Sequence, residues 1–444
     1  MKKITLFSIA MLMMFMAVAG LASGKAYAAT DTVALVSTGL RILAKDSGVA
    51  VSAVTGNELA FSPEDFERGL NQRRLDYITV TKAPDPALGT LYLGSEGIEA
   101  GKTISRESLH KLSYVEKTNG VTSNSFSFTT GNGYEIECSV YMLDKENYCP
   151  TAGNALELYS SVSTYRNVSV YGTLSGSDPD GDEITFEVVS YPEHGYVTVL
   201  GGGEFRYTPY PEYTGKDSFK YVVKDKYGNY SASSEVSLEV RGTKLSAVLS
   251  DMGGNKAHAA AIAMVEKGIM KSGDDAGAAV FSPENSVSRE EFLVMVMKAA
   301  GLNYADGQSF DGSAVKVNTG FADDADISDE ARNYVYLAKQ KGFIKGTEDG
   351  DGSCFYPKRD ITAAEAAVMI DGIIGASAYV VNTNATETVF SDHIDIPVWA
   401  ESSIRTLNYI GVMADANGYI YPEKAIDRAT AAMMLDAVMK LLES

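Results

Sequence analysis

Apolar and polar side chains alternate along the first half of the chain, whereas apolar side chains recur at helical spacing along the second half. From residue 151 to residue 240, short alternating runs are separated by turn residues, a pattern typical of a β-sandwich. Residues 75–143 repeat this layout, which predicts a second sandwich, and residues 63–70 before it are expected to be partly helical. The alternating apolar positions of the later sandwich include Ile184, Phe186, Val188, Phe219, Tyr221, Val223, Val236, Leu238 and Val240.

Three stretches of the second half repeat one pattern of two helices joined by a proline turn. In each stretch a glycine ends the first apolar helix, and the second helix opens four residues after the proline. A period of about 65 to 75 residues built from two helices predicts units that cannot bury their apolar faces alone, so the three second helices are expected around a shared axis. The repeated positions are Gly268, Gly342 and Gly411; Pro283, Pro357 and Pro422; Val287, Ile361 and Ile426.

The start of each second helix carries a capping signal. Two of the starts are capping boxes, in which side chains satisfy the orphan backbone donors of the first turn, and the third lacks the acidic residue. The paired residues are Ser288 with Glu291, Thr362 with Glu365, and Asp427 with Thr430.

Arg289 and Arg428 are expected as the first residues of two of these helices, and Ala363 holds the same position in the other repeat. A positive charge there opposes the helix dipole and costs on the order of 0.5 kcal/mol if it is exposed. Because Ala363 shows that stability does not require the arginine, an arginine beside free helix amides indicates an anion-binding site. The alternative is a solvated arginine on an exposed first turn.

The first residues resemble a secretory signal. Lys2 and Lys3 precede an uncharged apolar run, and Ala26-Tyr27-Ala28 forms a small-x-small cleavage site, so residues 1–28 are expected to be a signal peptide. An uncleaved membrane anchor is the alternative, and no later segment is expected to cross a bilayer.

Charge and length narrow the class of protein. The formal net charge is −20, and removing Lys2, Lys3 and Lys25 with the signal makes it −23, which argues against nucleic acid or anionic lipid as a partner. About 415 mature residues are too many for one core and indicate several domains.

The three cysteines are too few for a disulfide framework. Cys138 is in phase with an alternating strand, so a buried thiol is expected, with a bridge to Cys149 as the alternative. Cys354 is expected to be a packing residue.

Four motifs mark the later sandwich: Ser177-Asp178-Pro179-Asp180-Gly181-Asp182, Pro192-Glu193-His194-Gly195, Phe205-Arg206-Tyr207-Thr208-Pro209 and Tyr213-Thr214-Gly215-Lys216-Asp217-Ser218-Phe219. In these motifs residues 151–242 resemble the bacterial cadherin-like and Ig-like modules of surface proteins, and residues 29–150 look like a weaker relative without the acidic segment. Asp178, Asp180 and Asp182 place three hard oxygen ligands within five residues, which suits calcium, whereas the alternative is a solvated turn between strands.

Three short motifs recur in triplicate in the last third of the chain. They are the openings Leu249-Ser250-Asp251, Phe321-Ala322-Asp323 and Phe390-Ser391-Asp392, the helix ends Gly268-Ile269, Gly342-Phe343 and Gly411-Val412, and the caps Val287-Ser288-Arg289-Glu290-Glu291, Ile361-Thr362-Ala363-Ala364-Glu365 and Ile426-Asp427-Arg428-Ala429-Thr430. In these motifs the last third of the chain resembles the S-layer homology family.

This resemblance implies a pseudo-threefold helical module that binds secondary cell-wall polysaccharide, whose pyruvate ketal supplies a carboxylate. In that family the cap arginine, the opening aspartate and a tryptophan line grooves between repeats, which carries over to Arg289, Arg428, Asp251, Asp323, Asp392 and Trp399. The departures from the family pattern leave at most two competent grooves. They are Ala363, Thr430, and Lys256 and Glu330 in place of tryptophan.

No catalytic motif is found. The four histidines lie on different elements without a partner at catalytic or metal-ligand spacing and are expected at the surface: His110, His194, His258 and His393. The segment Asp349-Gly350-Asp351-Gly352-Ser353 starts like a calcium loop but lacks the required glycine, and is expected to be a plain loop.

The sequence therefore predicts a multidomain, exported bacterial cell-wall protein that is not an enzyme: two all-β Ig/cadherin-like sandwiches followed by an all-α module of three S-layer homology repeats. It requires no cofactor, and calcium is the one candidate. The alternatives are an adhesin or scaffold component whose β domains bind an unknown protein or glycan, and a surface enzyme with an unrecognised site in residues 30–150. The predicted domains are residues 29–150, 151–242, 245–305, 317–378 and 386–444.

Overall fold

The computed structural model describes residues 48–443 except 119, 132, 154–160, 244, 246–248, 303–316, 351, 380–389 and 414–417. The predicted signal peptide lies outside the described residues. None of the described helices is both long and apolar enough to cross a bilayer.

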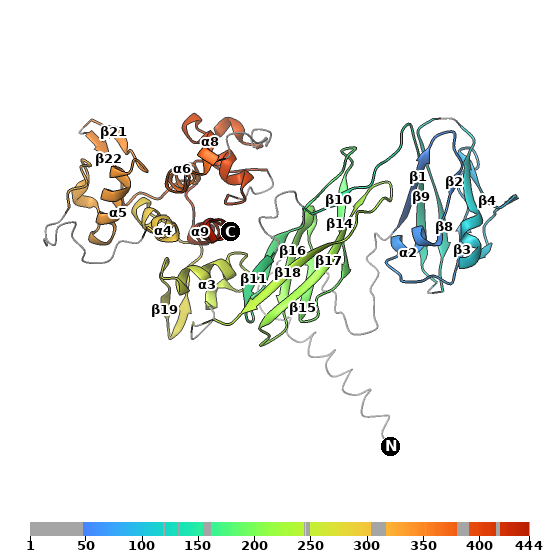
Figure 1. Cartoon of the computed structure of the whole chain (residues 1–444), viewed down its shortest axis with the longest axis horizontal. Coiled ribbons are helices and arrows are strands. Elements are labelled where there is room, and N and C mark those ends of the chain that lie inside the picture. Colours follow the sequence, from blue (N-terminus) through green and yellow to red (C-terminus); the bar gives the residue numbers. More distant parts are fainter. Residues whose placement is uncertain are drawn as a thin grey trace, which may run out of the picture. The chain divides into compact units, whose positions relative to one another are not determined.

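The first β domain consists of two sheets around one core (Figure 1). The larger sheet has the order β1-β9-β8-β3-β6, with β1 parallel to β9, and the smaller has the order β2-β7-β4-β5. The bounds are β1 Val49–Val54, β9 Glu135–Leu143, β8 Thr122–Thr129, β3 Tyr77–Lys82, β6 Thr103–Ser105, β2 Leu59–Ala60, β7 Leu112–Glu116, β4 Gly89–Leu93 and β5 Glu96–Gly97, with a 3-10 helix η1 at Arg106–Lys111.

Alternation along the strands fills this core, since Phe126 and Phe128 on β8 and Cys138 on β9 are fully buried. The predicted helical segment is present as α2 (Pro63–Gly69), which opens with a capping box and packs Phe66 edge-on against Phe128 at 5.3 Å between ring centroids. Cys138 is a free buried thiol, as predicted, and burial raises its pKa well above the ordinary value. Cys149 is exposed and free, so the alternative of a bridge between them is not realised here.

The second β domain has a four-stranded sheet, β11-β18-β17-β14, and a three-stranded sheet, β12-β16-β15. Phe205 and Phe219 from the two sheets meet edge-on at 5.1 Å in its core. Gly195 is required where it stands, because a Cβ there would lie 2.4 Å from the Tyr207 ring. The bounds are β10 Thr151–Ala152, β11 Ser161–Tyr165, β12 Val170–Thr173, β13 Gly176–Ser177, β14 Ile184–Ser190, β15 Gly195–Val199, β16 Glu204–Pro209, β17 Gly215–Asp225 and β18 Ser234–Arg241.

The last part of the chain contains three helical pairs. The first pair is α3 and α4, the second is α5 and α6, and the third is α8 and α9, with the one-turn helix α7 following α6. The bounds are α3 His258–Glu266, α4 Arg289–Ala299, α5 Asp329–Gln340, α6 Ala363–Ile374, α7 Ala376–Tyr379, α8 Val398–Tyr409 and α9 Arg428–Glu443.

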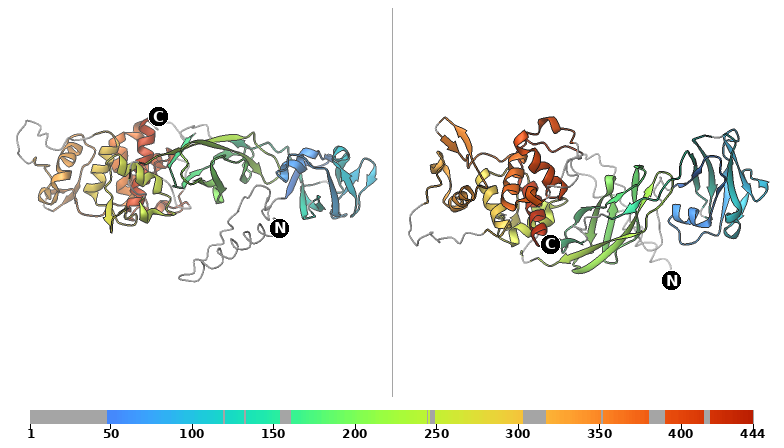
Figure 2. Two further views of the ribbon diagram at one scale, coloured as in Figure 1. Left: turned by 90° about the horizontal axis from the view of Figure 1, so that it is seen from below. Right: turned by 45° about the horizontal axis from the view of Figure 1, so that its top comes forward.

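The expectation that this region is all-α is wrong in one respect. Short β-hairpins separate the helices of the first two pairs, namely β19 (Gly273–Asp275) with β20 (Ala278–Val280), and β21 (Thr347–Asp349) with β22 (Gly352–Cys354). The second hairpin is visible at the upper left of the right-hand view in Figure 2. Its strands lie where a plain loop was expected, and they pair antiparallel from Thr347 with Cys354 to Asp349 with Gly352.

Backbone hydrogen bonds tie the starts of the three second helices into a closed ring. The amide of Val287 donates to Ile426 at 3.3 Å, that of Ile426 to Ile361 at 3.0 Å, and that of Ile361 to Val287 at 2.9 Å. All three side chains are buried. Beyond the ring, α4 packs against both α6 and α9, and the predicted apolar stripes of the three helices fill the core: Phe292, Met295, Val296, Ala366, Met369, Ile370, Ala431, Met434 and Leu435.

Candidate anion-binding grooves between the helical pairs

The three opening aspartates hold the proline turns of their own helical pairs. Each carboxylate accepts the amides of the two residues before the proline, and the second of these residues has a positive φ. The bonds run to Asp251 from Phe281 at 2.8 Å and Ser282 at 2.6 Å, to Asp323 from Phe355 at 2.8 Å and Tyr356 at 2.6 Å, and to Asp392 from Ile420 at 3.1 Å and Tyr421 at 2.7 Å. These aspartates therefore hold in place the turns that precede the second helices.

The amides at the helix starts are not free, so this part of the anion-site prediction is wrong. In each second helix the first two amides donate to carbonyl oxygens in the proline turn of the next pair, because the ring brings those turns against the helix ends. The donor and acceptor residues are Arg289 to Arg359, Glu290 to Pro357, Ala363 to Lys424, Ala364 to Pro422, Arg428 to Asn285 and Ala429 to Pro283, at 2.8 to 3.1 Å.

These bonds define three junctions in cyclic order. At junction 1–2 the start of α4 meets the turn before α6, at junction 2–3 the start of α6 meets the turn before α9, and at junction 3–1 the start of α9 meets the turn before α4. Any anion at a junction must then be bound by side chains, since the backbone donors are used.

At junction 1–2, Arg289 is buried and paired with a carboxylate of the same chain. Its guanidinium donates from Nε to the Phe355 carbonyl at 3.0 Å, lies 5.4 Å from the Phe355 ring centroid, and pairs with Glu365 at 3.0 Å. Only 8% of Arg289 is exposed. Burial lowers the pKa of Arg289, and the negative charge of Glu365 opposes that shift.

At junction 3–1, Arg428 has backbone partners and no ion pair with any described carboxylate. Its Nε donates to the Phe281 carbonyl at 2.8 Å, its Nη2 donates to the Lys271 carbonyl at 2.6 Å, and its guanidinium lies 4.6 Å from the Phe281 ring centroid. Glu291 is nearby, but its Oε2 accepts from the amide and hydroxyl of Ser288 at 3.0 and 2.7 Å. Partial burial lowers the pKa of Arg428.

A cleft of about 300 Å³ opens at junction 3–1. Its lining includes Arg428, Lys271, Asn285, Glu291 and Phe281, whose ring stacks against the Arg428 guanidinium. A half-buried guanidinium facing such a cleft can bind a carboxylate, because desolvation strengthens the charge-assisted hydrogen bonds.

At junction 2–3 the same three positions are all changed together. Ala363 stands in place of the arginine, Ile420 in place of the stacking phenylalanine, and Thr430 in place of the acidic cap residue. Along the sequence, Ala363 and Thr430 are two separate departures from the repeat pattern, because they lie in different repeats. The cyclic order of the junctions shows that they belong to one contact, a relation that spacing along the chain does not reveal.

Trp399 lies in the first turn of α8 and is 59% exposed, beside the exposed Ile394 and Val398. It is not among the residues that line the cleft at junction 3–1. Glu330, the corresponding residue of the second pair, forms an ion pair with Lys271 at 2.9 Å. The structure thus does not bring Trp399 and Arg428 together at one cleft.

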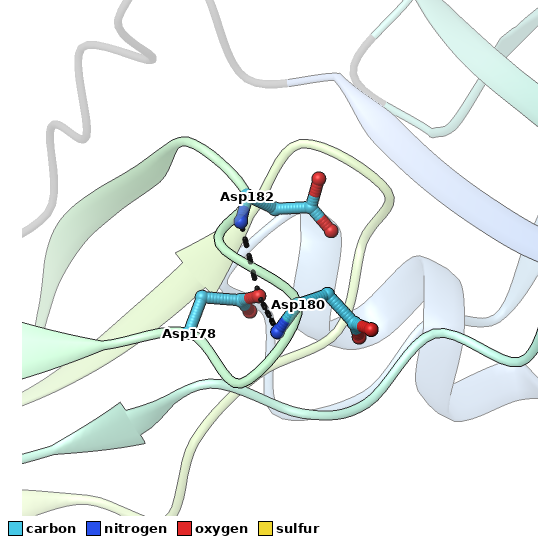
Figure 3. Close-up of side chains that lie close together, drawn as sticks. All are labelled: Asp178, Asp180 and Asp182. Atoms are coloured by element: carbon cyan, nitrogen blue, oxygen red, sulfur yellow. Dashed lines mark hydrogen bonds between the residues drawn. The ribbon is translucent and has the colours of Figure 1, made fainter.

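The three aspartates of the second β domain form a compact loop (Figure 3). One carboxylate oxygen of each lies within 4.8 Å of the others. Asp178 Oδ1 accepts the amides of Asp180 and Asp182 at 2.8 and 3.1 Å, and its buried Oδ2 has no partner. Lys145 pairs with Asp180 at 2.8 Å and lowers its pKa, while Lys226 pairs with Asp182 at 3.2 Å. The loop therefore has features of a calcium site, since its oxygens converge as they would around a cation. It also has features of a plain turn between strands, since backbone amides and two lysines partner the carboxylates.

The expectation for the histidines is wrong for one of them. His258 is buried at the start of α3, and burial lowers its pKa, whereas His110 and His393 are exposed and His194 is partly exposed. The helix start packs His258 inward, which the local sequence does not signal.

Comparison with known protein families finds two matches. Residues 147–242 match the bacterial cadherin-like domain, and residues 320–367 match the S-layer homology domain, which falls within the second helical pair. An amylopullulanase of Thermoanaerobacterium thermosulfurigenes is 31% identical over 140 residues, which make up 32% of this chain and 7% of that protein. The chain thus spans only a small fraction of that relative.

Solved structures are similar only over parts of the chain. The fibronectin(III)-like modules of Clostridium thermocellum CbhA share 12% identity over 45% of this chain and 93% of that chain, with a TM-score of 0.20. Drosophila N-cadherin EC1-3 shares 15% identity over 44% of this chain and 63% of that chain, with a TM-score of 0.20. An endo-fucoidan hydrolase, MfFcnA4, shares 16% identity over 38% of this chain and 24% of that chain, with a TM-score of 0.18.

Proposed function

The chain carries a bacterial cadherin-like domain and an S-layer homology domain, and we propose that it is a non-catalytic cell-surface protein anchored to the bacterial cell wall by its helical region. In this proposal the three helical pairs are three S-layer homology repeats, and the β domains are displayed from the wall. The ring of hydrogen bonds through Val287, Ile361 and Ile426 supports three equivalent units, although the family match covers the second alone.

The proposed ligand is secondary cell-wall polysaccharide that carries pyruvate ketals. The observation that carries this proposal is Arg428, a half-buried guanidinium without an ion-pair partner among the described residues, facing a cleft of about 300 Å³. A ketal carboxylate would complete its hydrogen bonds, and the stacked Phe281 keeps the guanidinium in place for it.

Co-sedimentation of the whole protein with purified walls tests this function. The wild type is expected to bind intact walls and to bind walls stripped of pyruvate by mild acid much less. Arg428→Ala should weaken binding to intact walls by roughly tenfold or more, since a hydrogen-bonded charge contributes about 1.5 to 3 kcal/mol. Arg166→Ala, which removes an exposed arginine paired with Glu212, is the matched control. Equal sedimentation of all variants with both wall preparations would refute the ligand.

The proposed absence of catalytic activity requires a separate assay. Because one relative is named an amylopullulanase, the whole protein should be incubated with pullulan, starch and the wall polysaccharide. We expect no release of reducing sugar, and release that persists after affinity purification would favour a surface enzyme.

Calcium is proposed as a stabilising ion at Asp178, Asp180 and Asp182. Its supports are the converging oxygens and the unpartnered, buried Asp178 Oδ2. Because Lys145 and Lys226 must be displaced, we expect weak binding, with a dissociation constant on the order of 10⁻⁴ to 10⁻³ M. Calcium should raise the melting temperature of the wild type and of the control Asp275→Asn, but not that of Asp178→Asn.

Adhesion through the second β domain is a second candidate function. Tyr191 and Tyr196 are 58% and 51% exposed, and Tyr196 contacts the exposed Tyr210 edge-on at 5.0 Å between ring centroids. Exposed aromatic rings are common at binding surfaces. If this face grips a ligand, Tyr196→Ala should abolish retention on immobilised wall glycan by a protein that already carries Arg428→Ala.

A further inference from the structure

The two arginine junctions differ in where the neighbouring acidic cap residue points. At junction 1–2, Oε2 of Glu365 accepts the Thr362 amide of its own helix cap at 3.2 Å, while Oε1 forms the ion pair with Arg289 at 3.0 Å. At junction 3–1 the equivalent Glu291 directs Oε2 to Ser288 and makes no ion pair with Arg428. Both glutamates cap a helix, but only Glu365 also binds the arginine of the neighbouring pair.

A second arginine accounts for this difference. Arg359, two residues after the turn proline, also pairs with Glu365 Oε1. The corresponding residue before α4 is Asn285, which is uncharged. Two positive charges on one oxygen hold Glu365 toward Arg289, whereas Asn285 adds no second charge beside Glu291, which stays hydrogen-bonded to its cap.

Glu365 therefore occupies the position on Arg289 that an external acid would need. The side chains of Arg289 and Glu365 are 10% and 15% exposed, so the pair is largely shielded from water. A ligand carboxylate could reach Arg289 only by breaking its largely buried ion pair with Glu365, which is unfavourable.

We propose that Glu365 is an internal competitor that closes junction 1–2 to anionic ligands, held in place by Arg359, so that each chain binds one acidic sugar residue, at junction 3–1. This inference rests on the proposed function, because it assumes that the ligand presents a carboxylate. Arg289 and Arg428 are equivalent in sequence but have different roles: Arg289 pairs with Glu365, and Arg428 binds the ligand. Junction 2–3 lacks the arginine altogether, since Ala363 stands at its position.

Titration calorimetry of the whole protein with pyruvylated oligosaccharide, released from purified wall polysaccharide, tests the stoichiometry. The wild type is expected to bind one equivalent, and Arg428→Ala none. Glu365→Gln should bind two, because glutamine retains the capping box while releasing the charge from Arg289. Glu348→Gln is the control, with the same substitution at an exposed glutamate of β21 that does not line the cleft, and should still bind one.

The double variant Arg428→Ala with Glu365→Gln gives the sharpest outcome. It should regain one equivalent, now at junction 1–2, although Arg428→Ala alone binds none. A melting curve supplies a second readout: Glu365→Gln should melt lower than the wild type without ligand, and the ligand should raise its melting temperature more than that of the wild type, because the ligand acid replaces the lost partner of Arg289.

The outcomes separate this inference from the proposed function. If the wild type binds one equivalent through Arg428 but Glu365→Gln still binds one, Glu365 is no competitor and the inference is wrong. Two equivalents on the wild type also refute it. If the wild type fails to distinguish pyruvylated from acid-treated oligosaccharide, the proposed function itself is wrong. Should Glu365→Gln not fold, Arg359→Asn reproduces the arrangement of junction 3–1 and is expected to bind two equivalents.

Discussion

At the residue scale, the opening aspartates show how one carboxylate fixes a turn that the backbone resists. Ser282, Tyr356 and Tyr421 have φ values of 57°, 56° and 51°, which L-residues seldom adopt. Each donates its amide hydrogen to its aspartate, as does the residue before it, and each lies directly before a proline. The same geometry in all three pairs explains why these aspartates recur.

Asp323→Asn should therefore destabilise the helical region. The amide group offers one acceptor oxygen in place of two, so one of the Phe355 and Tyr356 amides loses its partner at a cost of about 1 to 3 kcal/mol. Denaturant unfolding followed by the fluorescence of Trp399 measures the loss. The exposed neighbour substitution Asp326→Asn should leave the midpoint unchanged; equal midpoints for both variants would mean that the turn does not depend on Asp323.

Glu67 provides a pH-dependent contribution in the first β domain. A hydrogen bond from Arg106 holds the pKa of Glu67 below the ordinary 4.5, against the opposing effect of burial. A carboxylate whose folded pKa is lowered stabilises the fold above its unfolded pKa, and that stability is lost as the pH falls through the folded pKa.

The melting temperature of Glu67→Gln should therefore lie below that of the wild type at pH 7, and the gap should shrink as the pH falls below about 4.5. Melting curves from pH 7 to about pH 3 measure the gap. The exposed Glu99→Gln serves as control. A constant gap across this range would show that Glu67 titrates alike in both states.

At the element scale, the starts of α4, α6 and α9 act as parts of one assembly. The first two amides of each helix donate to carbonyl oxygens in the proline turn of the next pair. Two of the three helices also begin with an arginine that stacks on a phenylalanine of that turn. An arginine introduced at position 363 would enter a position that is 6% exposed, at a junction where Thr430 replaces the glutamate. The arginine, the phenylalanine and the glutamate therefore change together at junction 2–3.

A double-mutant cycle tests this coupling. Ala363→Arg alone should destabilise the protein, whereas adding Thr430→Glu should recover part of the loss, with a favourable coupling of about 1 kcal/mol or more. Chemical denaturation of the two single variants and the double variant gives the coupling energy. Simple additivity would mean that residues 363 and 430 do not meet across junction 2–3.

At the scale of the whole molecule, net charge and local charge act in opposite directions. The chain carries −20 overall, yet the proposed ligand is a polyanion bound through one arginine. Long-range repulsion is screened beyond a Debye length of about 10 Å at 0.1 M salt, while the contact with Arg428 in its cleft is screened less. Raising the salt concentration should therefore speed association.

Surface-immobilised wall polysaccharide allows this to be measured. Between about 20 mM and about 200 mM NaCl, the association rate of the wild type should rise severalfold, and the dissociation rate should change little. A protein that binds through a broad basic patch would instead lose affinity steeply with salt. A falling association rate would thus contradict binding through a single cleft.

Local signals explain which features could be predicted. The capping boxes at Ser288 and Thr362, the buried thiol of Cys138 and the helix at residues 63–70 depend on neighbours a few positions away. The hairpins β19–β20 and β21–β22 were missed because three-residue strands are too short to show a period.

The sequence by itself determined the order of β and helical regions, the threefold spacing of prolines and caps, and the residue types available at each helix start. Only the tertiary structure decided which partner each of these residues meets. Closing three repeats into a ring sets the second-helix start of one against the proline turn of the next, so Arg289 is neutralised by Glu365 while Arg428 faces an open cleft. Charge pairing depends on distance through space, and that distance is fixed by packing among segments remote in the chain.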